Sequence, residues 1–188
     1  MGIRLEKTFK GHNLVIRTAT AEDAPVLVKW WNDGKVMEHA GFPLGLGTNE
    51  DKVINDSIRK ISNDRQLLII EYDNNKIGEM SYRREGETTD FGIKICEDSY
   101  QESGIGTTLL DMLFEHLFYT CMCTKITCDT NLNNARAQHV YENKMHMKKV
   151  KISYDCWKNQ IGEIQSTVFF ELTKENYEKN KEVSIVEL

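Results

Sequence analysis

The sequence predicts a mixed α/β fold of the α+β type, in which a mostly antiparallel central sheet is flanked by helices. Two observations carry this prediction. Residues 65–72, 76–84 and 91–96 are β-type runs separated by turn clusters, which is typical of an antiparallel meander. The third run passes through two glycines into residues 110–118, where apolar residues recur at helical spacing. We therefore expect a single domain over residues 1–188.

The N-terminal part of the chain is expected to supply one strand and two helices. Residues 14–18 form the first strand. Thr20 is a candidate N-cap with Asp23 three residues later, the acidic form of a capping box. The helix that follows should end at the glycine of residues 32–34. Apolar residues at helical spacing in residues 48–63 predict the second helix.

Residues 40–47 lie between these two helices and predict a loop, because they contain three glycines and a proline. The apolar residues of this loop suggest that it packs against another part of the protein. Glycine-rich loops with aromatic residues often line sites. A plain surface connection is the alternative, and both interpretations stay open.

The C-terminal half continues with alternating strands and helices. We expect a strand at residues 125–129, a helix at 131–144, and strands at 148–155 and 165–172. The complete order is β-α-α-β-β-β-α-β-α-β-β. The charge-rich tail at residues 173–188 could be a short helix or a loose end.

Composition and charge narrow the functional class. The net charge is −5, from 24 basic and 29 acidic residues, which gives no electrostatic footprint for a nucleic-acid partner. No apolar run approaches the roughly 20 residues of a membrane span. The 5 cysteines include no C-x-x-C pair, and we expect no metal site. Because no apolar leader precedes the domain, we expect a cytoplasmic protein without membrane contact.

Gly104 and Gly106, between strand and helix, mark a candidate ligand site. Glycine lets backbone N–H groups approach a ligand, and the first turn of a helix carries unpartnered N–H groups and partial positive charge. These features suit a phosphate-bearing ligand. Thr107 stands where a P-loop has lysine, and Leu109 stands where a Rossmann fingerprint has its third glycine. A helix entry that needs flexible residues only for packing is the alternative.

Two motifs resemble those of the GNAT superfamily of acyl-CoA-dependent N-acyltransferases. Gln101-x-x-Gly104-x-Gly106 is similar to the family's Gln/Arg-x-x-Gly-x-Gly/Ala loop, and residues 134–142 are similar to its Asn-x-x-Ala-x-x-x-Tyr-Glu helix. The predicted element order is also the GNAT order. The chain departs from the family at residues 144–147, where Lys-Met-His-Met replaces Leu-Gly-Phe. The first strand and helix resemble the branch that contains ribosomal-protein and small-molecule acetyltransferases.

The resemblance implies an N-acetyltransferase that uses acetyl-CoA (coenzyme A) as co-substrate and transfers the acetyl group directly to a primary amine. In this family the glycine loop holds the pyrophosphate of coenzyme A, which implies Gln101, Glu102, Ser103, Gly104, Ile105, Gly106 and Thr107 here. The resemblance also implies an oxyanion-binding backbone N–H on the strand that ends near Ile95 or Cys96. Asn134 could hydrogen-bond the pantetheine arm or cap its own helix.

Acyl transfer from a thioester requires a proton donor for the leaving thiolate, and Tyr141 of the helix motif is the candidate. Packing of its ring on the core is the alternative. Asp90 and Glu79 lie on neighbouring strands, and alternation places Asp90 on the face opposite Phe91. Asp90 is therefore a candidate catalytic base; the alternative, which the strand position favours, is a solvated strand residue, with water removing the amine's proton.

The expected acceptor is a small-molecule amine or a protein N-terminus. The mildly acidic charge favours a cationic acceptor over nucleic acid. Trp157 and residues 169–170 could form a homodimer interface or belong to the core. Two other functions stay open: a catalytically silent acyl-CoA-binding regulator of the same fold, and a nucleotide-binding or structural domain. Coenzyme A binding without turnover would indicate the regulator, and no binding would indicate the latter.

Overall fold

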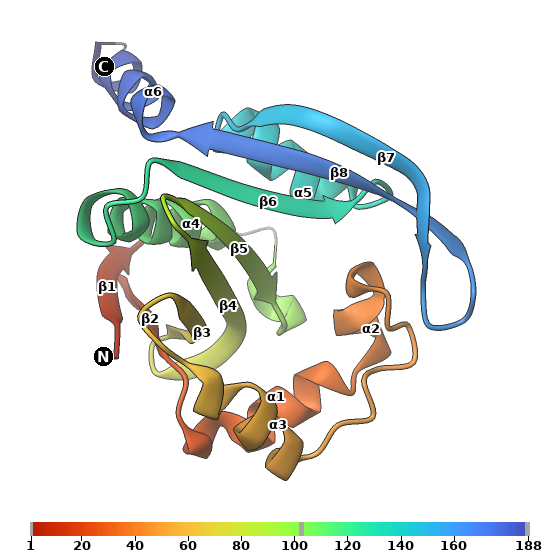
Figure 1. Cartoon of the computed structure of the whole chain (residues 1–188). Helices are drawn as coiled ribbons and strands as arrows, with labels where there is room; N and C mark the ends of the chain where they lie inside the picture. Colours follow the sequence, from red (N-terminus) through yellow and green to blue (C-terminus); the bar gives the residue numbers. More distant parts are fainter. Residues whose placement is uncertain (1, 102–103, 187–188) are drawn as a thin grey trace.

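The computed structural model describes residues 2–101 and 104–186, with side chains in the last helix described up to residue 182 (Figure 1). The strands are β1 Arg4–Phe9, β2 His12–Thr18, β3 Arg65–Tyr72, β4 Asn75–Glu85, β5 Thr88–Ile95, β6 Lys125–Asn131, β7 Lys148–Lys158 and β8 Ile164–Thr173. The helices are α1 Ala24–Trp31, α2 Gly34–Met37, α3 Glu50–Asp56, α4 Ile105–Glu115, α5 Ala135–His139 and α6 Lys174–Val186. The π-helical turns His116–Thr120 and Val140–Lys144 extend α4 and α5. The predicted mixed α/β class is confirmed.

The 8-stranded sheet is antiparallel except near its middle. Its strand order is β1-β2-β3-β4-β5-β6-β8-β7, and only β5 and β6 pair in parallel among these neighbours. That parallel pairing covers residues 88–90 of β5 and residues 125–127 of β6. β5 continues to Ile95 and β6 to Asn131, so the two strands diverge beyond Asp90 (Figure 1). The sheet therefore opens into a V between β5 and β6.

Strand β1 has no counterpart among the elements predicted from the sequence. It forms a hairpin with β2 through Lys10 and Gly11, whose φ angles are 51° and 84°. Two consecutive positive φ values match the type I′ turn of tight hairpins. β1 is a charged edge strand without a clear alternation of apolar and polar residues. In the structure only Leu5 and Phe9 of this strand are partly buried.

Helix α1 ends near the predicted position, but Gly34 does not act as its stop signal. The predicted capping box is present, since the Thr20 N–H donates to the Asp23 carboxylate at 2.8 Å. Gly34 instead begins α2. A Cβ on Gly34 would lie 2.0 Å from the carbonyl oxygen of Pro43, so glycine is required by a close backbone approach.

Two further predicted segments differ in length from the helices that the structure contains. The helix expected at residues 48–63 is α3, capped by the side chain of Asn49, and a separate 3-10 turn at Ile58–Lys60 follows it. The tail expected at residues 173–188 contains α6, so the helical alternative is present over Lys174–Val186.

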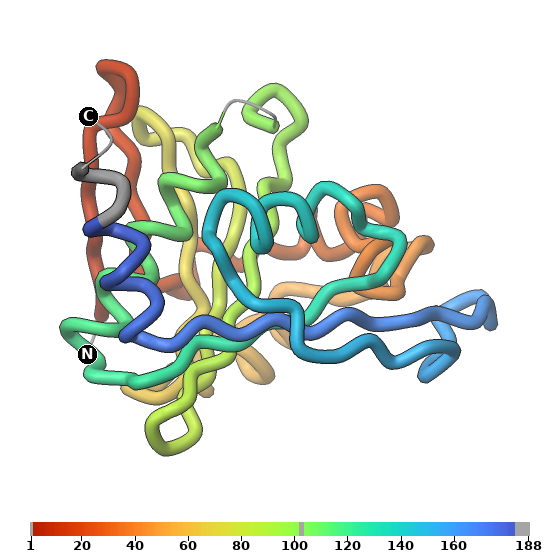
Figure 2. The backbone as a smooth tube through the Cα atoms, turned by 90° about the horizontal axis from the view of Figure 1, so that it is seen from above, coloured from red at the N-terminus to blue at the C-terminus, as the bar shows by residue number. Residues whose placement is uncertain are grey.

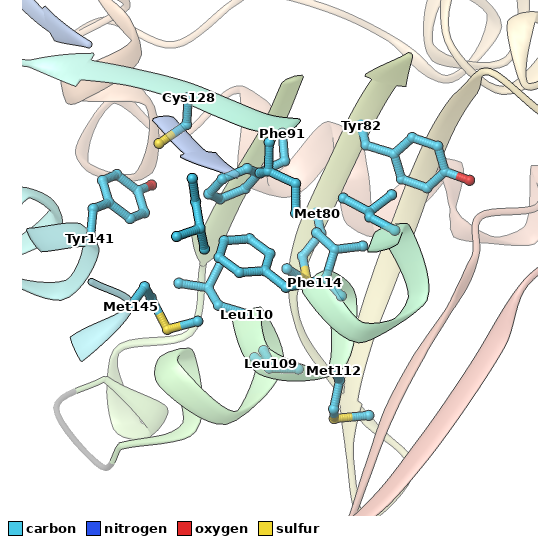
Figure 3. Close-up of a cluster of buried hydrophobic side chains, with 14 of the residues drawn as sticks. Met80, Tyr82, Phe91, Leu109, Leu110, Met112, Phe114, Cys128, Tyr141 and Met145 are labelled. Atoms are coloured by element: carbon cyan, nitrogen blue, oxygen red, sulfur yellow. The ribbon is translucent and has the colours of Figure 1, made fainter. Parts of the chain in front are cut away.

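The sheet separates two apolar clusters. The cluster under α4 includes Leu14, Ile16, Leu68, Ile70, Met80, Phe91, Leu109, Leu113, Phe114, Phe118, Ile126, Tyr141 and Phe170. In Figure 3, Phe91 lies between Phe114 and Tyr141, with ring centroids 5.1 and 5.8 Å away. The cluster under α1 and α3 includes Ala24, Leu27, Trp30, Val53, Leu67, Ile69 and Cys96. Alternate residues of β3 therefore face one cluster or the other.

The hairpin of β7 and β8 forms an arm that reaches the loop of residues 41–47 (Figure 2). Gln160 at the tip of the arm donates its N–H to the carbonyl oxygen of Gly41 at 2.8 Å. The apolar side chains of the loop pack less than we expected, because Leu44 is 72% exposed. The loop does contact another part of the protein, but mainly through its backbone.

Candidate active site

A cleft of about 620 Å³ lies where β5 and β6 diverge. On the side of α4 and α5 its lining residues are Gln101, Gly106, Leu110, Asn134, Arg136, Ala137, Val140 and Tyr141. On the side of α2 and the arm they are Lys35, Val36, Glu38, His39, Ala40, Trp157 and Thr167. The open ends of β5 and β6 lie between these two groups and contribute residues 92–95 and 129–131. The two candidate motifs thus meet in one cleft.

The glycines at the start of α4 differ in what they do. Gly104 is the N-cap and has φ 87°, a left-handed conformation that favours glycine. Gly106 lies within the first turn without such a φ, and a Cβ there would meet no atom within 4 Å. Neither backbone conformation nor packing requires glycine at position 106, yet the residue lines the cleft. The space beside Gly106 is therefore suited to a ligand.

The first turn of α4 also supplies donors for an anion. The backbone N–H groups of Gly106 and Thr107 have no acceptor among the residues that the structure describes, as expected at a helix start. The positive end of the helix dipole adds to their attraction for a phosphate. The Ile105 side chain is buried in the core, so only its backbone could contact a ligand. Glu102 and Ser103, also predicted for this loop, lie outside the described residues.

Gln101 joins the glycine loop to β5 and α5. Its Nε2 donates to the carbonyl oxygen of Ile95 at 3.1 Å, and its Oε1 accepts a hydrogen bond from Arg136 Nη1 at 2.8 Å. Arg136 lies inside the helix motif of residues 134–142, and the motif itself does not mark it as a site residue. Its guanidinium group lines the cleft beside the helix start and adds positive charge there.

Of the two strand residues predicted to offer an oxyanion-binding N–H, the structure brings only Ile95 to the cleft. The Cys96 N–H donates to the carbonyl oxygen of Ile77 at 2.8 Å, and its side chain belongs to the cluster under α1 and α3. The Ile95 carbonyl faces Gln101 instead. Since the N–H and C=O of one strand residue point to the same side, the Ile95 N–H also faces the diverging strands.

Tyr141 lies in the π-helical turn after α5 and lines the cleft. The residue is only 6% exposed, and its ring packs against Phe91 and Phe170. The hydroxyl has no hydrogen-bond partner among the described residues. Burial raises the pKa of Tyr141 above its ordinary value, and nearby Cys128 and Asp129 act in the same direction. The hydroxyl therefore keeps its proton at ordinary pH.

Asn134 takes the capping role that the sequence predicts as one alternative. Its Oδ1 accepts a hydrogen bond from the Ala137 N–H at 3.1 Å, and its Nδ2 donates to Thr130 Oγ1 at 3.3 Å. The residue also lines the cleft. A contact between Asn134 and the pantetheine arm stays a prediction.

Asp90 lies at the point where β5 and β6 stop pairing, but it does not line the cleft. Its side chain is exposed, and Thr127 Oγ1 donates to its Oδ1 at 3.4 Å. Partial desolvation and the nearby Asp129 raise its pKa. This position matches the solvated-strand alternative, and Asp129 is the carboxylate of β6 that reaches the cleft.

The far wall of the cleft is built by residues that sequence reasoning did not assign to a site. Trp157 lines the cleft and its Nε1 donates to Thr167 Oγ1 at 3.0 Å. A Cβ on Gly41 would lie 2.5 Å from the Trp157 ring, so this glycine lets the arm and the loop meet. The contact joins positions more than a hundred residues apart, and no local pattern indicates it. Phe170, in contrast, belongs to the core under α4.

The described part of the chain contains neither a candidate metal site nor a candidate membrane-spanning helix. Residues 2–101 and 104–186 contain no group of three or more His, Cys, Asp or Glu side chains that could hold a metal ion. None of the described helices is both long enough and apolar enough to span a membrane.

Comparison with known proteins shows the family to which the chain belongs. The family model of the acetyltransferase (GNAT) domain matches residues 13–147, which is more than half of the chain. The structure is similar to that of spermidine N-acetyltransferase from Vibrio cholerae in complex with CoA and spermine, with a TM-score of 0.75 and 18% identity over 87% of this chain and 97% of that chain.

Two other solved structures are similar at the level of the fold. Aminoglycoside acetyltransferase AAC(6')-Ib in complex with coenzyme A has a TM-score of 0.71 and 19% identity, over 89% of this chain and 99% of that chain. The ribosomal-protein alpha-N-acetyltransferase RimL in complex with coenzyme A has a TM-score of 0.75 and 14% identity, over 87% of this chain and 95% of that chain.

Proposed function

Because the chain belongs to the GNAT acetyltransferase family, we propose that it is an acetyl-CoA-dependent N-acetyltransferase that acts on a primary amine. The acceptor is a small molecule or a protein N-terminus, and transfer is direct. The observation that carries the proposal is the unfilled space beside Gly106 at the first turn of α4, inside the cleft formed by the diverging strands. The three similar proteins named above acetylate a polyamine, an aminoglycoside and a ribosomal protein, which supports an amine acceptor.

In the proposed complex the start of α4 binds the pyrophosphate of acetyl-CoA. The N–H groups of Gly106 and Thr107 donate to phosphate oxygens, and the absence of a Cβ at Gly106 allows the close approach. Arg136 contributes positive charge and also fixes Gln101. Asn134 is placed to bond the pantetheine arm through an amide atom while it caps α5.

The reacting carbonyl then lies between β5 and Tyr141. The backbone N–H of Ile95 stabilises the oxyanion, since it faces the diverging strands. The hydroxyl of Tyr141 donates its proton to the leaving thiolate. A primary amine with a pKa near 10 is mostly protonated at pH 7, and water in the open cleft removes that proton. No covalent intermediate with a protein side chain is needed.

The variant Gly106→Glu tests the proposal because its two effects have opposite signs. The Cβ of glutamate meets no atom of the protein, and glutamate is a better helix former than glycine, so it should stabilise the unliganded protein by about 0.5–1 kcal/mol. The same side chain brings a negative charge into the space assigned to the pyrophosphate, and should weaken acetyl-CoA binding at least ~10-fold. Thermal unfolding and isothermal titration calorimetry with acetyl-CoA measure the two effects.

Thr108→Ala is the matched control, because it also improves helix propensity in α4 but changes no residue that lines the cleft. It should stabilise the protein and leave acetyl-CoA affinity unchanged. If Gly106→Glu binds acetyl-CoA as tightly as the wild type, the ligand does not occupy this space and the proposed site is wrong. Coenzyme A binding with no acetylation of any amine would instead support the silent regulator.

A further inference from the structure

A second cavity, of about 280 Å³, adjoins the cleft on the sheet face that α1 and α3 cover. Lys94 is the residue that lines both cavities. The apolar walls of the second cavity come from Trp31, Met37, Leu46, Ile61 and Leu67. Its size and its position next to the proposed reaction site suit the far end of an acceptor molecule.

This second cavity contains a carboxylate oxygen without a partner. Glu79 on β4 is 5% exposed, and its Oε1 accepts a hydrogen bond from Lys94 Nζ at 3.0 Å. Its Oε2 is buried and has no hydrogen-bond partner among the described residues. Burial tends to lower the pKa of Lys94, but the Glu79 carboxylate outweighs this and raises it, so Lys94 stays charged. A buried acceptor is costly to leave unpaired, so a donor from a ligand would bind favourably at Oε2.

The other buried carboxylate among the described residues shows what Glu79 lacks. Asp23 is 1% exposed, and two cations bond its oxygens: Arg17 at 2.8 and 2.9 Å, and Lys76 at 2.6 Å. Glu79 has one cation, Lys94. Glu79 lines the second cavity, and its second oxygen has no second basic partner among the described residues. The vacant position therefore has the chemistry of a cationic N–H donor.

We infer that the second cavity binds an ammonium group of the acceptor, and that this group donates a hydrogen bond to Glu79 Oε2 without taking part in the reaction. The inference rests on the proposed function and narrows it: the acceptor carries at least two amino groups joined by an aliphatic chain. The apolar walls accommodate that chain. It passes Lys94 on its way from the second cavity to the cleft.

Two arguments separate this ammonium group from the amine that reacts. Glu79 pairs in register with Ile69 and faces the cluster under α1 and α3, whereas Tyr141 packs in the cluster under α4. The anchored group and the proposed proton donor are thus on opposite faces of the sheet. In addition, an ammonium nitrogen has no lone pair and cannot attack a carbonyl. The other amino group of the same molecule is therefore the nucleophile.

Arg65 defines the main competing ligand class. Its side chain also lines the second cavity, and together with Lys94 it would attract an anionic group. Arg65 is exposed, so water and salt screen its charge, whereas the Glu79 carboxylate is buried. An anionic probe of the same length as the diamine therefore discriminates between the two possibilities.

Three probes of equal chain length test the inference: cadaverine, pentylamine and 5-aminopentanoate, which differ in ending in an ammonium, a methyl or a carboxylate group. Release of the coenzyme A thiol at saturating acetyl-CoA gives kcat and KM for each probe. Wild-type protein should have its lowest KM for cadaverine. Glu79→Gln should raise that KM at least ~10-fold, as expected for a lost charge-assisted hydrogen bond, with a smaller change in kcat and none for pentylamine.

Controls separate the lost charge from a damaged fold. Glutamine can still accept the hydrogen bond from Lys94, and unchanged acetyl-CoA affinity in Glu79→Gln would show that the cleft is intact. Glu79→Asp keeps the charge and should recover part of the preference for cadaverine. Glu85→Gln removes an exposed carboxylate from the same strand and should leave every KM unchanged.

The outcomes also distinguish the inference from the proposed function. Equal KM values for cadaverine in wild type and Glu79→Gln, or a wild-type preference for 5-aminopentanoate, would overturn the inference while acetylation of pentylamine upholds the enzyme. If acetyl-CoA does not bind, the proposed function fails. Calorimetry of cadaverine with the protein alone then tests whether the second cavity binds an ammonium group. Cadaverine binding that depends on Glu79 would support the cation site. Cadaverine binding that is absent or independent of Glu79 would show that the inference is wrong.

Discussion

The ring of Tyr141 packs edge-on against Phe91 and Phe170, with centroid separations of 5.8 and 5.6 Å. This packing fixes the side chain without using its hydroxyl group (Figure 3). Burial raises the pKa of the hydroxyl, so it keeps its proton at any pH where an amine is acylated. The two alternatives considered from the sequence, core packing and proton donation, are therefore compatible in one residue. The ring of Tyr141 belongs to the core, and its hydroxyl oxygen stays available to a ligand in the cleft.

Tyr141→Phe should separate chemistry from binding. Phenylalanine keeps the aromatic packing and removes only the hydroxyl, so acetyl-CoA affinity should stay within about 2-fold while the acetyl-transfer step slows by roughly 10²-fold or more. Calorimetry and single-turnover thiol release measure the two quantities. Tyr154→Phe, which removes a hydroxyl from a side chain that is 69% exposed, is the control and should change neither. An unchanged single-turnover rate in Tyr141→Phe would remove this residue from the mechanism.

The raised pKa of Tyr141 also fixes the sign of the pH dependence. A donor whose pKa lies above its ordinary value of about 10 is still protonated at pH 9. The rate should therefore rise between pH 7 and pH 9 as the amine loses its proton, with no falling limb in that interval. A fall that is present in the wild type and absent in Tyr141→Phe would show that the hydroxyl ionises in this range.

At the scale of elements, the turn after α5 shows how this chain replaces a family feature. His146 has φ 52°, a left-handed conformation, near the place where the family motif has glycine. The turn is nevertheless formed, because the Met147 N–H donates to the carbonyl oxygen of Tyr141 at 2.9 Å. A residue with a Cβ costs roughly 1–2 kcal/mol in this conformation. The turn therefore forms at the expense of some local strain.

His146→Gly should relieve that strain and stabilise the protein by about 1 kcal/mol, which corresponds to a Tm increase of roughly 2–4 °C for a chain of this size. The His146 side chain is exposed, so little packing is lost. His139→Gly is the matched control, because the same change inside α5 should destabilise the protein by about 1 kcal/mol. Thermal unfolding measures both, and a lower Tm for His146→Gly would mean that the side chain contributes more than its conformation costs.

The sequence predicted those helices and strands whose characteristic residue pattern lies within the element itself. Residues 65–72 are apolar and β-branched and are followed by a turn cluster, and β3 has these bounds. Strand β1 was missed because an exposed, charged edge strand has little periodicity. The role of Gly34 was wrong because it depends on Pro43, which only the folded loop brings near.

The features of the candidate site also fall into those that a local motif predicts and those that depend on contacts between distant segments. The glycine loop and the tyrosine helix are local motifs, and the fold brings both to the cleft. The choice between Ile95 and Cys96 depends on a hydrogen bond to Ile77 on the neighbouring strand, so the sequence could not make it. The unpaired oxygen of Glu79 likewise becomes visible only when burial and all partners are known.

At the scale of the whole molecule, the arm closes the side of the cleft that the sheet leaves open. The direct pairing of β5 with β6 covers only residues 88–90 and 125–127, so the strands that follow depend on other contacts for their position. Gln160 at the tip of the arm provides such a contact. Its Oε1 accepts a hydrogen bond from the Leu44 N–H at 2.9 Å, and its Nε2 donates to the carbonyl oxygen of Gly45 at 2.9 Å.

Gln160→Ala should therefore loosen the loop of residues 41–47 and leave the rest of the fold in place. Loss of two side-chain hydrogen bonds, at about 1 kcal/mol each or less in this exposed setting, should speed hydrogen exchange of the Leu44 amide about 10-fold. The KM for the acceptor should rise, because Trp157 lines the far wall of the cleft and its ring packs beside Gly41 of this loop, while acetyl-CoA affinity stays constant. Lys158→Ala, on the same arm, is the control and should change neither quantity. Faster exchange without any change in acceptor KM would show that the arm supports the loop but that acceptor binding does not depend on it.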